Sequence, residues 1–170
     1  MNKIRVLPLD VSMKIAAGEV VERPASVVKE LVENALDAGA TEIKVELEEG
    51  GKRLIRVIDN GYGMNKEDAL ICFERHSTSK ITGEEDLDHI STLGFRGEAL
   101  PSISAVSRVN LKTSVGDESP GICLEREGEQ VLGTEEIAYP QGTSVEVRDL
   151  FFNLPARRKF LRSENAELSL

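Results

Sequence analysis

The 170-residue chain has no tryptophan, few aromatic residues (4%) and only two cysteines. Cys72 and Cys123 lie far apart and neither belongs to a C-x-x-C pair, which indicates reduced, buried thiols rather than a disulfide framework. No apolar run approaches the roughly 18 residues that a membrane helix needs, and the N-terminus lacks the apolar core of a signal peptide. We therefore expect a cytoplasmic protein that does not engage a membrane.

The chain also lacks excess positive charge. Lysine and arginine number 21 against 30 aspartates and glutamates, which gives a net charge of −9. This excludes a strongly basic nucleic-acid module, because neutralising phosphates requires excess cations, but it leaves room for a local basic patch. The 40% apolar content is ordinary for a globular domain, and the length predicts one domain.

Several common catalytic motifs are missing. The sequence has no G-x-x-x-x-G-K-[ST] loop, no G-x-G-x-x-G after a strand, no kinase signature pair and no G-x-S-x-G elbow. Its two histidines form no H-E-x-x-H pair, which argues against a zinc site. A phosphate-binding site in this chain must therefore be of another kind.

Hydrophobic periodicity changes along the chain. A helical period over 24–38 forms an apolar face that we expect to be buried. The period becomes two over 43–47, and after the turn at 49–51 a more buried strand follows over 54–58, so these two strands are expected to pair as a hairpin. Asn65 is positioned to cap a helix with an apolar face of Ala69, Leu70 and Phe73.

The remaining elements are one further early helix, a helix before a series of strands, and a helical end. We expect helices over 12–17, 98–105 and 155–170, and strands over 107–115, 121–126, 129–138 and 143–148. This order predicts an α+β fold: a two-layer α/β sandwich with a mixed, mostly antiparallel sheet and helices on one face.

The helix over 24–38 carries a polar row. Glu30, Asn34 and Ala38 recur every four residues and so share one face of the helix. A carboxylate and an amide one turn apart suit a general base beside an oxygen ligand for Mg²⁺. The alternative is a solvated face, as on most amphipathic helices.

The segment Asp59-Asn60-Gly61-Tyr62-Gly63 directly follows a buried strand. Its two glycines permit positive φ and close approach of a ligand to the backbone, and an aspartate at a strand end can accept a hydrogen bond from an exocyclic amine. The alternative is an Asx turn that leads into a helix.

Two loops, of which the second is rich in glycine, and one threonine complete the candidates. The stretch 78–80 and the Gly-rich loop 94–100, which opens into a helix, present backbone N–H groups suited to a triphosphate; the alternative is a surface loop closed by a helix cap. Gly142-Thr143 precedes a strand and is the last candidate; the alternative is an ordinary turn.

A basic cluster lies near the C-terminus. It consists of Arg157, Arg158, Lys159 and Arg162, with no acidic residue between Asp149 and Glu164. We expect weak DNA contact through it, or contact with an acidic partner. The alternative is a solvated helix face that complements the dipole of its own helix.

Taken in order, these segments closely resemble the four ATP-binding motifs of the GHKL superfamily, the ATPases related to gyrase, histidine kinases and MutL. The stretches 15–24 and 153–161 resemble its MutL mismatch-repair branch in particular, and the resemblance covers essentially the whole chain. It implies ATP and Mg²⁺ as cofactors, with Glu30 as the catalytic base, Asn34 as the Mg²⁺ ligand, Asp59 as acceptor for the adenine amine and Thr143 as a second adenine contact through water. The cofactor-binding residues that it implies are Asn34, Ala38, Asp59, Gly61, Gly63, Met64, Thr78, Ser79, Lys80, Gly94, Phe95, Arg96, Gly97, Glu98, Ala99, Leu100 and Thr143.

The resemblance further implies an N-terminal ATPase domain over 1–170, with a transducer-like second domain and a C-terminal dimerisation domain absent. ATP would be hydrolysed slowly, order a lid at 76–97 and drive dimerisation, which couples a mismatch-recognition protein of the MutS type to downstream repair factors. In such relatives a lysine from the following domain reaches the γ-phosphate, so we expect little or no turnover from this length alone. The alternatives are a nucleotide-gated interaction module without turnover, or another GHKL ATPase.

Overall fold

The computed structural model describes residues 4, 8, 21–74, 99–116, 119–159 and 161. The helix expected over 12–17 lies outside these residues. The described elements are, in chain order, α2 (Pro24–Asp37), β1 (Ile43–Glu48), the short 3₁₀ helix η1 (Glu49–Gly51), β2 (Leu54–Asp59), α3 (Lys66–Ile71), α5 (Ala99–Ala105), β3 (Arg108–Ser114), β4 (Gly121–Glu127), β5 (Gln130–Ile137), β6 (Gly142–Arg148) and α6 (Pro155–Lys159).

The strands form one sheet in the order β1-β2-β6-β3-β4-β5. The predicted hairpin is confirmed, since β1 and β2 pair antiparallel with Ile43 opposite Asp59. We expected a mixed, mostly antiparallel sheet, but every described pairing is antiparallel. The reason is that β6 returns between β2 and β3, and both of these run opposite to it.

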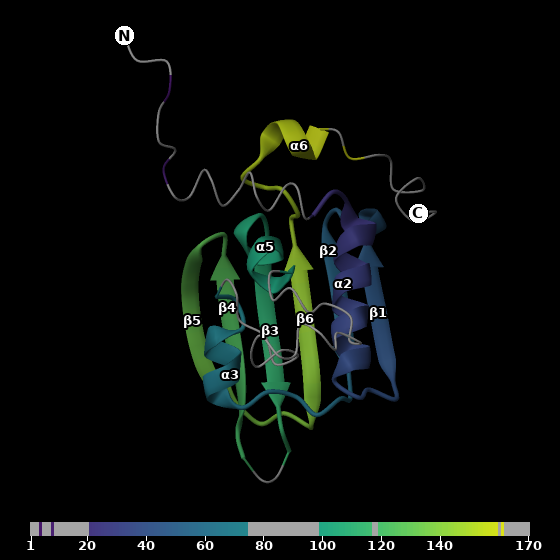
Figure 1. Ribbon diagram of the computed structural model, residues 1–170, viewed down its shortest axis with the longest axis vertical. Coiled ribbons are helices and arrows are strands. Elements are labelled where there is room, and N and C mark those ends of the chain that lie inside the picture. Colours follow the sequence, from purple (N-terminus) through teal and green to yellow (C-terminus); the bar gives the residue numbers. More distant parts are fainter. Residues whose placement is uncertain are drawn as a thin grey trace.

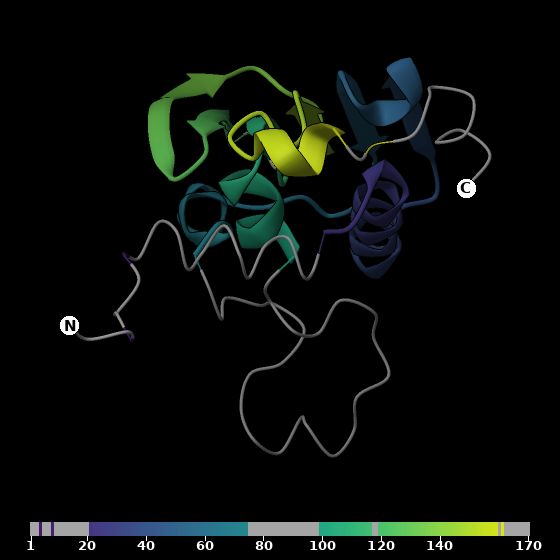
Figure 2. The same cartoon turned by 90° about the horizontal axis from the view of Figure 1, so that it is seen from above.

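Helices cover one face of this sheet. Figure 2 shows α2, α3 and α5 in a layer on the same side of the strands, while the other face of the sheet carries no described helix. The helix α6 lies at the end of the sheet toward which β6 points (Figure 1). The two-layer α/β sandwich predicted from the sequence is therefore confirmed.

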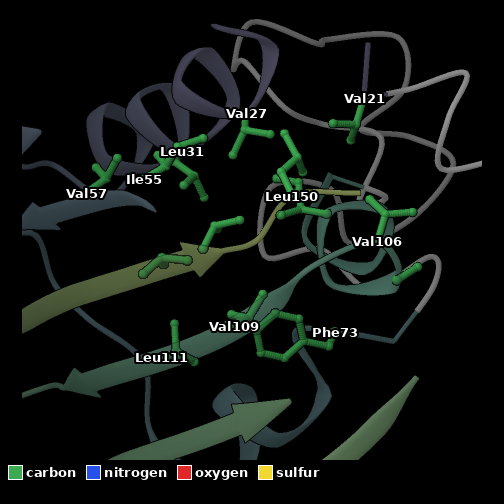
Figure 3. Close-up of a cluster of buried hydrophobic side chains, with 14 of the residues drawn as sticks. Val21, Val27, Leu31, Ile55, Val57, Phe73, Val106, Val109, Leu111 and Leu150 are labelled. Carbon is green, nitrogen blue, oxygen red and sulfur yellow. The ribbon is translucent and has the colours of Figure 1, made fainter. Parts of the chain in front are cut away.

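The core lies between these two layers. Val27 and Leu31 of α2 belong to the same buried cluster as Ile55 and Val57 of β2 (Figure 3). Burying such a side chain contributes about 1.5–3 kcal/mol, which is why the helical spacing of valine and leucine located α2 correctly. Leu36 belongs to the same helical pattern of apolar residues over 24–38, but it is 53% exposed and does not join this core.

The helix α3 begins as predicted. The Asn65 side chain accepts a hydrogen bond from the Asp68 N–H at 2.8 Å, which satisfies one of the free donors of the first turn. Ala69 and Phe73 are buried, whereas Leu70 is 42% exposed and does not belong to the apolar face. Leu70 therefore lies on the solvent side of this six-residue helix.

The C-terminal helix is shorter than predicted. α6 ends at Lys159, and the Leu161 N–H closes a three-residue turn onto the Arg158 carbonyl oxygen at 3.2 Å, so the prediction of a continuous helix over 155–170 is wrong. Residues 162–170 lie outside the described part. Across the described ranges, no helix combines the length and the apolarity that crossing a bilayer requires.

Two arginines attach α6 to the body of the domain. The Arg157 guanidinium donates to the Val21 carbonyl oxygen at 3.2 Å and lies 5.4 Å from the centre of the Phe151 ring. The Arg158 guanidinium donates to the Leu150 carbonyl oxygen at 2.9 Å. Both side chains are partly buried, so they stabilise the end of the sheet rather than form a free cationic surface.

We expect Arg157→Ala and Arg158→Ala each to lower the free energy of unfolding by about 1–2 kcal/mol, because each removes a hydrogen bond to a carbonyl and, for Arg157, a contact with an aromatic ring. Lys159→Ala is the matched control, since Lys159 is exposed, and it should change the value by less than about 0.5 kcal/mol. Urea unfolding of the three variants tests this. Equal stability of all three would contradict the proposed attachment.

Candidate functional site

The described site residues gather at one end of the sheet. Asp59 is the last residue of β2, Thr143 is the second residue of β6, and the two are direct cross-strand partners. Ala38 follows the last turn of α2, which packs over β2 at this end (Figure 1). The candidate motifs on α2, after β2 and at the start of β6 are therefore brought together.

The loop after β2 is fastened to the chain that follows α2. The Asn60 side-chain oxygen accepts from the Thr41 and Glu42 N–H groups at 2.8 and 3.0 Å, and its amide nitrogen donates to the Thr41 hydroxyl at 2.8 Å. The Tyr62 N–H donates to the Ala38 carbonyl oxygen at 2.9 Å. Sequence analysis gave Asn60 no role of its own, although an asparagine directly after a buried strand is a common signal for this kind of loop bond.

The glycines of this end are required by close packing of the backbone. A Cβ on Gly63 would lie 1.9 Å from the Ser114 carbonyl oxygen, and one on Gly61 would lie 2.6 Å from the Ala38 oxygen. Gly63 also has φ of +71°, which favours glycine. A side chain at either position would therefore collide with the protein's own backbone. That Gly61 and Gly63 also line a ligand stays a prediction.

Asp59 is a half-buried carboxylate with two backbone donors. Its Oδ1 accepts from the Gly61 N–H at 2.8 Å, and the Thr143 N–H also donates to the carboxyl group. Burial raises the pKa of Asp59 above its ordinary value of 3.8, and the two backbone hydrogen bonds oppose this shift. The carboxylate is therefore held in a fixed orientation at a cost in desolvation.

A fully buried threonine, Thr113, joins the candidate residues from three segments. Its Oγ1 accepts from the Met64 N–H at 2.9 Å, lies 3.0 Å from the Gly142 carbonyl oxygen and lies 2.8 Å from the Thr143 Oγ1. Sequence analysis missed Thr113, because in the strand pattern of 107–115 nothing distinguishes it from any other inward-facing residue.

On α2, the candidate row borders the buried stripe. Val27, Leu31 and Ala35 are buried, while Glu30 and Asn34 are half-buried. These two belong neither to the core nor to a fully exposed face, which weakens the alternative of a solvated surface. Their oxygen atoms are the type of ligand that Mg²⁺ prefers, and Mg²⁺ is commonly held by one or two protein oxygens together with substrate phosphates. The residues present thus fit this cation.

The remaining candidates divide between described and undescribed residues. Ala99 and Leu100 begin α5 and are half-buried. Thr78, Ser79, Lys80, Gly94, Phe95, Arg96, Gly97, Glu98 and Arg162 lie outside the described residues. Their phosphate-binding and DNA-binding roles stay predictions.

An open hollow lies beside this end of the sheet. It is lined by Gly116, Ser119, Pro120 and residues 136–141, and so contains none of the predicted site residues. The Gln141 side chain connects the two regions, because its amide donates to the Gly61 carbonyl oxygen at 3.3 Å.

Comparison with known proteins places this geometry in a family. Residues 22–146 match the family model described as "Histidine kinase-, DNA gyrase B-, and HSP90-like ATPase". The chain is 61% identical over 169 residues to the DNA mismatch repair protein MutL of Solibacter usitatus, covering 99% of the chain and 26% of that protein. It is also 61% identical over 167 residues to MutL of Syntrophotalea carbinolica, covering 98% of the chain and 27% of that protein.

Solved structures agree with these matches. The Aquifex aeolicus MutL ATPase domain complexed with ADP is 45% identical, with a TM-score of 0.67, over 87% of the chain and 51% of that structure's chain. The N-terminal domain of a DNA repair protein is 31% identical, with a TM-score of 0.72, over 86% of the chain and 41% of the other. The chain thus spans about a quarter of the length of the curated relatives that it matches.

Because the family model covers most of its length, the chain belongs to the family of histidine kinase-, DNA gyrase B- and HSP90-like ATPases, and the two relatives described above, which match it over 99% and 98% of its length, are MutL proteins.

Proposed function

We propose that this chain is the N-terminal ATPase domain of a longer MutL-type DNA mismatch-repair protein, and that it binds ATP and hydrolyses it slowly. The observation that carries the proposal is the placement of Asp59, Thr143 and the loop 60–63 beside the polar row of α2. The ADP complex of a relative with the same fold supports the choice of nucleotide.

In this proposal the end of the sheet recognises the base. The Asp59 carboxylate accepts a hydrogen bond from the exocyclic amine of adenine, since two backbone donors already hold it in place. Gly61, Gly63, Met64, Ala38 and Thr143 surround the base. A half-buried carboxylate that is held in place discriminates between ligands, because a ligand without the amine leaves it without that hydrogen bond.

The row on α2 performs the chemistry. Glu30 takes the proton from the water that attacks the γ-phosphorus, and Asn34 ligates Mg²⁺ through its side-chain oxygen. When bound, Mg²⁺ neutralises charge on the phosphates. Residues 78–80 and 94–100 supply backbone N–H groups to the phosphates, so catalysis consists of positioning and electrostatic stabilisation.

The wider function involves parts beyond the chain. We propose that ATP binding orders residues 76–97, brings two copies together and so signals from a mismatch-recognition protein of the MutS type to later repair factors. Turnover by the chain alone is low, since a lysine outside it would reach the γ-phosphate. The chain matches 169 residues of a MutL protein that is about four times longer, which supports assigning these further steps to other parts of the full-length protein.

The variants Glu30→Ala and Asp59→Asn separate the two halves of the site. Glu30→Ala should bind ATP–Mg²⁺ within about threefold of wild type, yet lose at least about 100-fold in hydrolysis in the full-length protein, because only the general base is removed. Asp59→Asn should lose about tenfold or more in affinity, because a charge-assisted hydrogen bond is lost. Isothermal titration and a phosphate-release assay measure the two quantities. Undiminished turnover of Glu30→Ala would contradict the assignment of Glu30 as the general base. Unchanged affinity of Asp59→Asn would contradict the assignment of Asp59 to adenine recognition.

The raised pKa of Asp59 predicts a pH-dependent stability difference. A carboxyl group whose pKa is higher when folded binds its proton more tightly in the folded state, so wild type is favoured at low pH. Relative to Asp59→Asn, wild type should therefore lose stability as the pH rises from 3.8, the ordinary value, through the raised pKa, and then level off. Urea unfolding of both proteins over this pH range gives the difference. A difference that grows in favour of wild type as the pH rises would show that the pKa is lowered instead.

DNA contact, if it uses α6, depends on Lys159. Arg157 and Arg158 are engaged with backbone carbonyls, whereas Lys159 is exposed. We expect Lys159→Glu to weaken DNA binding of the full-length protein at low salt and to flatten its salt dependence, because one phosphate contact is lost. Lys112→Glu, at an exposed lysine of β3, is a control for the change of charge. An unchanged salt dependence in Lys159→Glu would remove α6 from the DNA-binding surface.

A further inference from the structure

Thr113 occupies an unusual position for a hydroxyl group, because it is completely buried and surrounded by three polar partners. Its exposed fraction is 0%. The partners come from the loop after β2 and from the start of β6: the Met64 N–H, the Gly142 carbonyl oxygen and the Thr143 hydroxyl. Thr113 lies on β3 directly opposite Thr143, which in turn lies directly opposite Asp59 on β2. Three side chains thus form a row across neighbouring strands on the face that the helices cover.

The partners of Thr113 determine where its proton points. A hydroxyl group has one proton to donate and two lone pairs to accept with. The Gly142 carbonyl can only accept, so it takes the Thr113 proton at 3.0 Å. The Met64 N–H can only donate, so it occupies one lone pair at 2.9 Å. One lone pair remains for Thr143, whose hydroxyl therefore donates to Thr113 across 2.8 Å.

This arrangement fixes the hydrogen-bonding character of Thr143. Its only proton is directed inward to Thr113, so toward the site its oxygen offers lone pairs alone. Asp59 beside it also offers only lone pairs when ionised. The end of the sheet therefore presents two neighbouring acceptors, and it favours a ligand edge, or a bridging water, that brings hydrogen-bond donors.

We propose that Thr113 is a positioning residue that holds Thr143 as an acceptor and thereby makes the site select a 6-amino purine over a 6-oxo purine. The inference rests on the proposed function, since it presumes that a purine nucleotide binds here. The two purines differ at position 6, where adenine carries an amine that donates and hypoxanthine carries an oxygen that only accepts; at position 1 the order is reversed, so the discrimination applies to a ligand that places position 6 against the two acceptors. Without Thr113, the Thr143 hydroxyl is free to turn and donate to that oxygen.

The experiment compares binding of ATP–Mg²⁺ and inosine triphosphate–Mg²⁺ by isothermal titration. Thr113→Val removes the hydroxyl and keeps the shape of the side chain, so the preference for ATP over inosine triphosphate should fall at least about fivefold. Thr113→Ser keeps the hydroxyl and should retain the wild-type preference. Adding Thr113→Val to Thr143→Val should change the preference no further than Thr143→Val alone, because Thr113 acts through Thr143.

Ser114→Ala is the matched control. Ser114 is the next residue on β3, is 1% exposed and accepts from the Gly116 N–H at 3.1 Å, but its side chain points to the opposite face of the sheet. Loss of the Ser114 hydroxyl should lower the melting temperature, as loss of the Thr113 hydroxyl should. Unlike the change at Thr113, it should leave the nucleotide preference unchanged. The preference therefore separates positioning from a purely structural role.

Two results would overturn the inference, and a third would overturn the proposed function on which it rests. A Thr113→Val protein with reduced melting temperature and a preference within about twofold of wild type would make Thr113 structural only. If Thr113→Val does not fold, Thr143→Val decides, because an unchanged preference in that variant removes the acceptor from recognition. A wild-type chain that binds neither nucleotide would instead overturn the proposed function itself, and this outcome differs from the other two, in which wild type binds ATP.

Discussion

The hydrogen bonds that tie the loop after β2 to the end of α2 set the geometry on which the site depends. α2 and β2 would pack through Val27, Leu31, Ile55 and Val57 in any case, but apolar contacts are not directional and tolerate small shifts along the helix axis. The bonds from Asn60 and Tyr62 to residues 38–42 remove that freedom. They determine how far along the sheet the row of Glu30 and Asn34 lies from Asp59.

The same constraint explains why positions 61 and 63 are glycines and why the Asp59 carboxylate is partly desolvated. Fastening the loop so closely to α2 and β3 leaves no room for side chains at Gly61 and Gly63. It also places the carboxylate of Asp59 in a partly buried position that raises its pKa. A neutral side chain would avoid this desolvation, so the retention of a charged group at the end of a packed strand is better explained by binding than by stability. Locally unfavourable choices of this kind are expected where a fold serves a site.

The sequence predicted most of the elements because their signals are local and repeated. The spacing of Val27, Leu31 and Ala35 located α2, and alternation located the strands within one or two residues. The length of α6 was wrong, and the bonds by which Arg157 and Arg158 attach this short helix to the domain are tertiary contacts that no periodicity reveals. Thr113 was missed for a related reason: its role arises only when β3 lies next to β6, a pairing between residues 30 positions apart. The candidate residues on α2, after β2 and on β6 were indicated by polar spacing and by glycines at strand ends, and the resemblance to a family then added their roles, whereas the bonds that orient them are a property of the fold.

The acidic balance of the chain bears on how it would hold a triphosphate. The described side chains of the site are carboxylates, an amide and hydroxyls, namely Glu30, Asp59, Asn34 and Thr143, and the chain as a whole carries a net charge of −9. A triphosphate bound beside two carboxylates is repelled unless positive charge accompanies it. Under the proposed function that charge comes with the ligand, as Mg²⁺ on Asn34, from the dipoles of backbone N–H groups and from the predicted site residues Lys80 and Arg96. Under that proposal, recognition by base, metal and backbone lets a strongly acidic domain bind an acidic nucleotide, while the same acidity disfavours unspecific attachment to DNA.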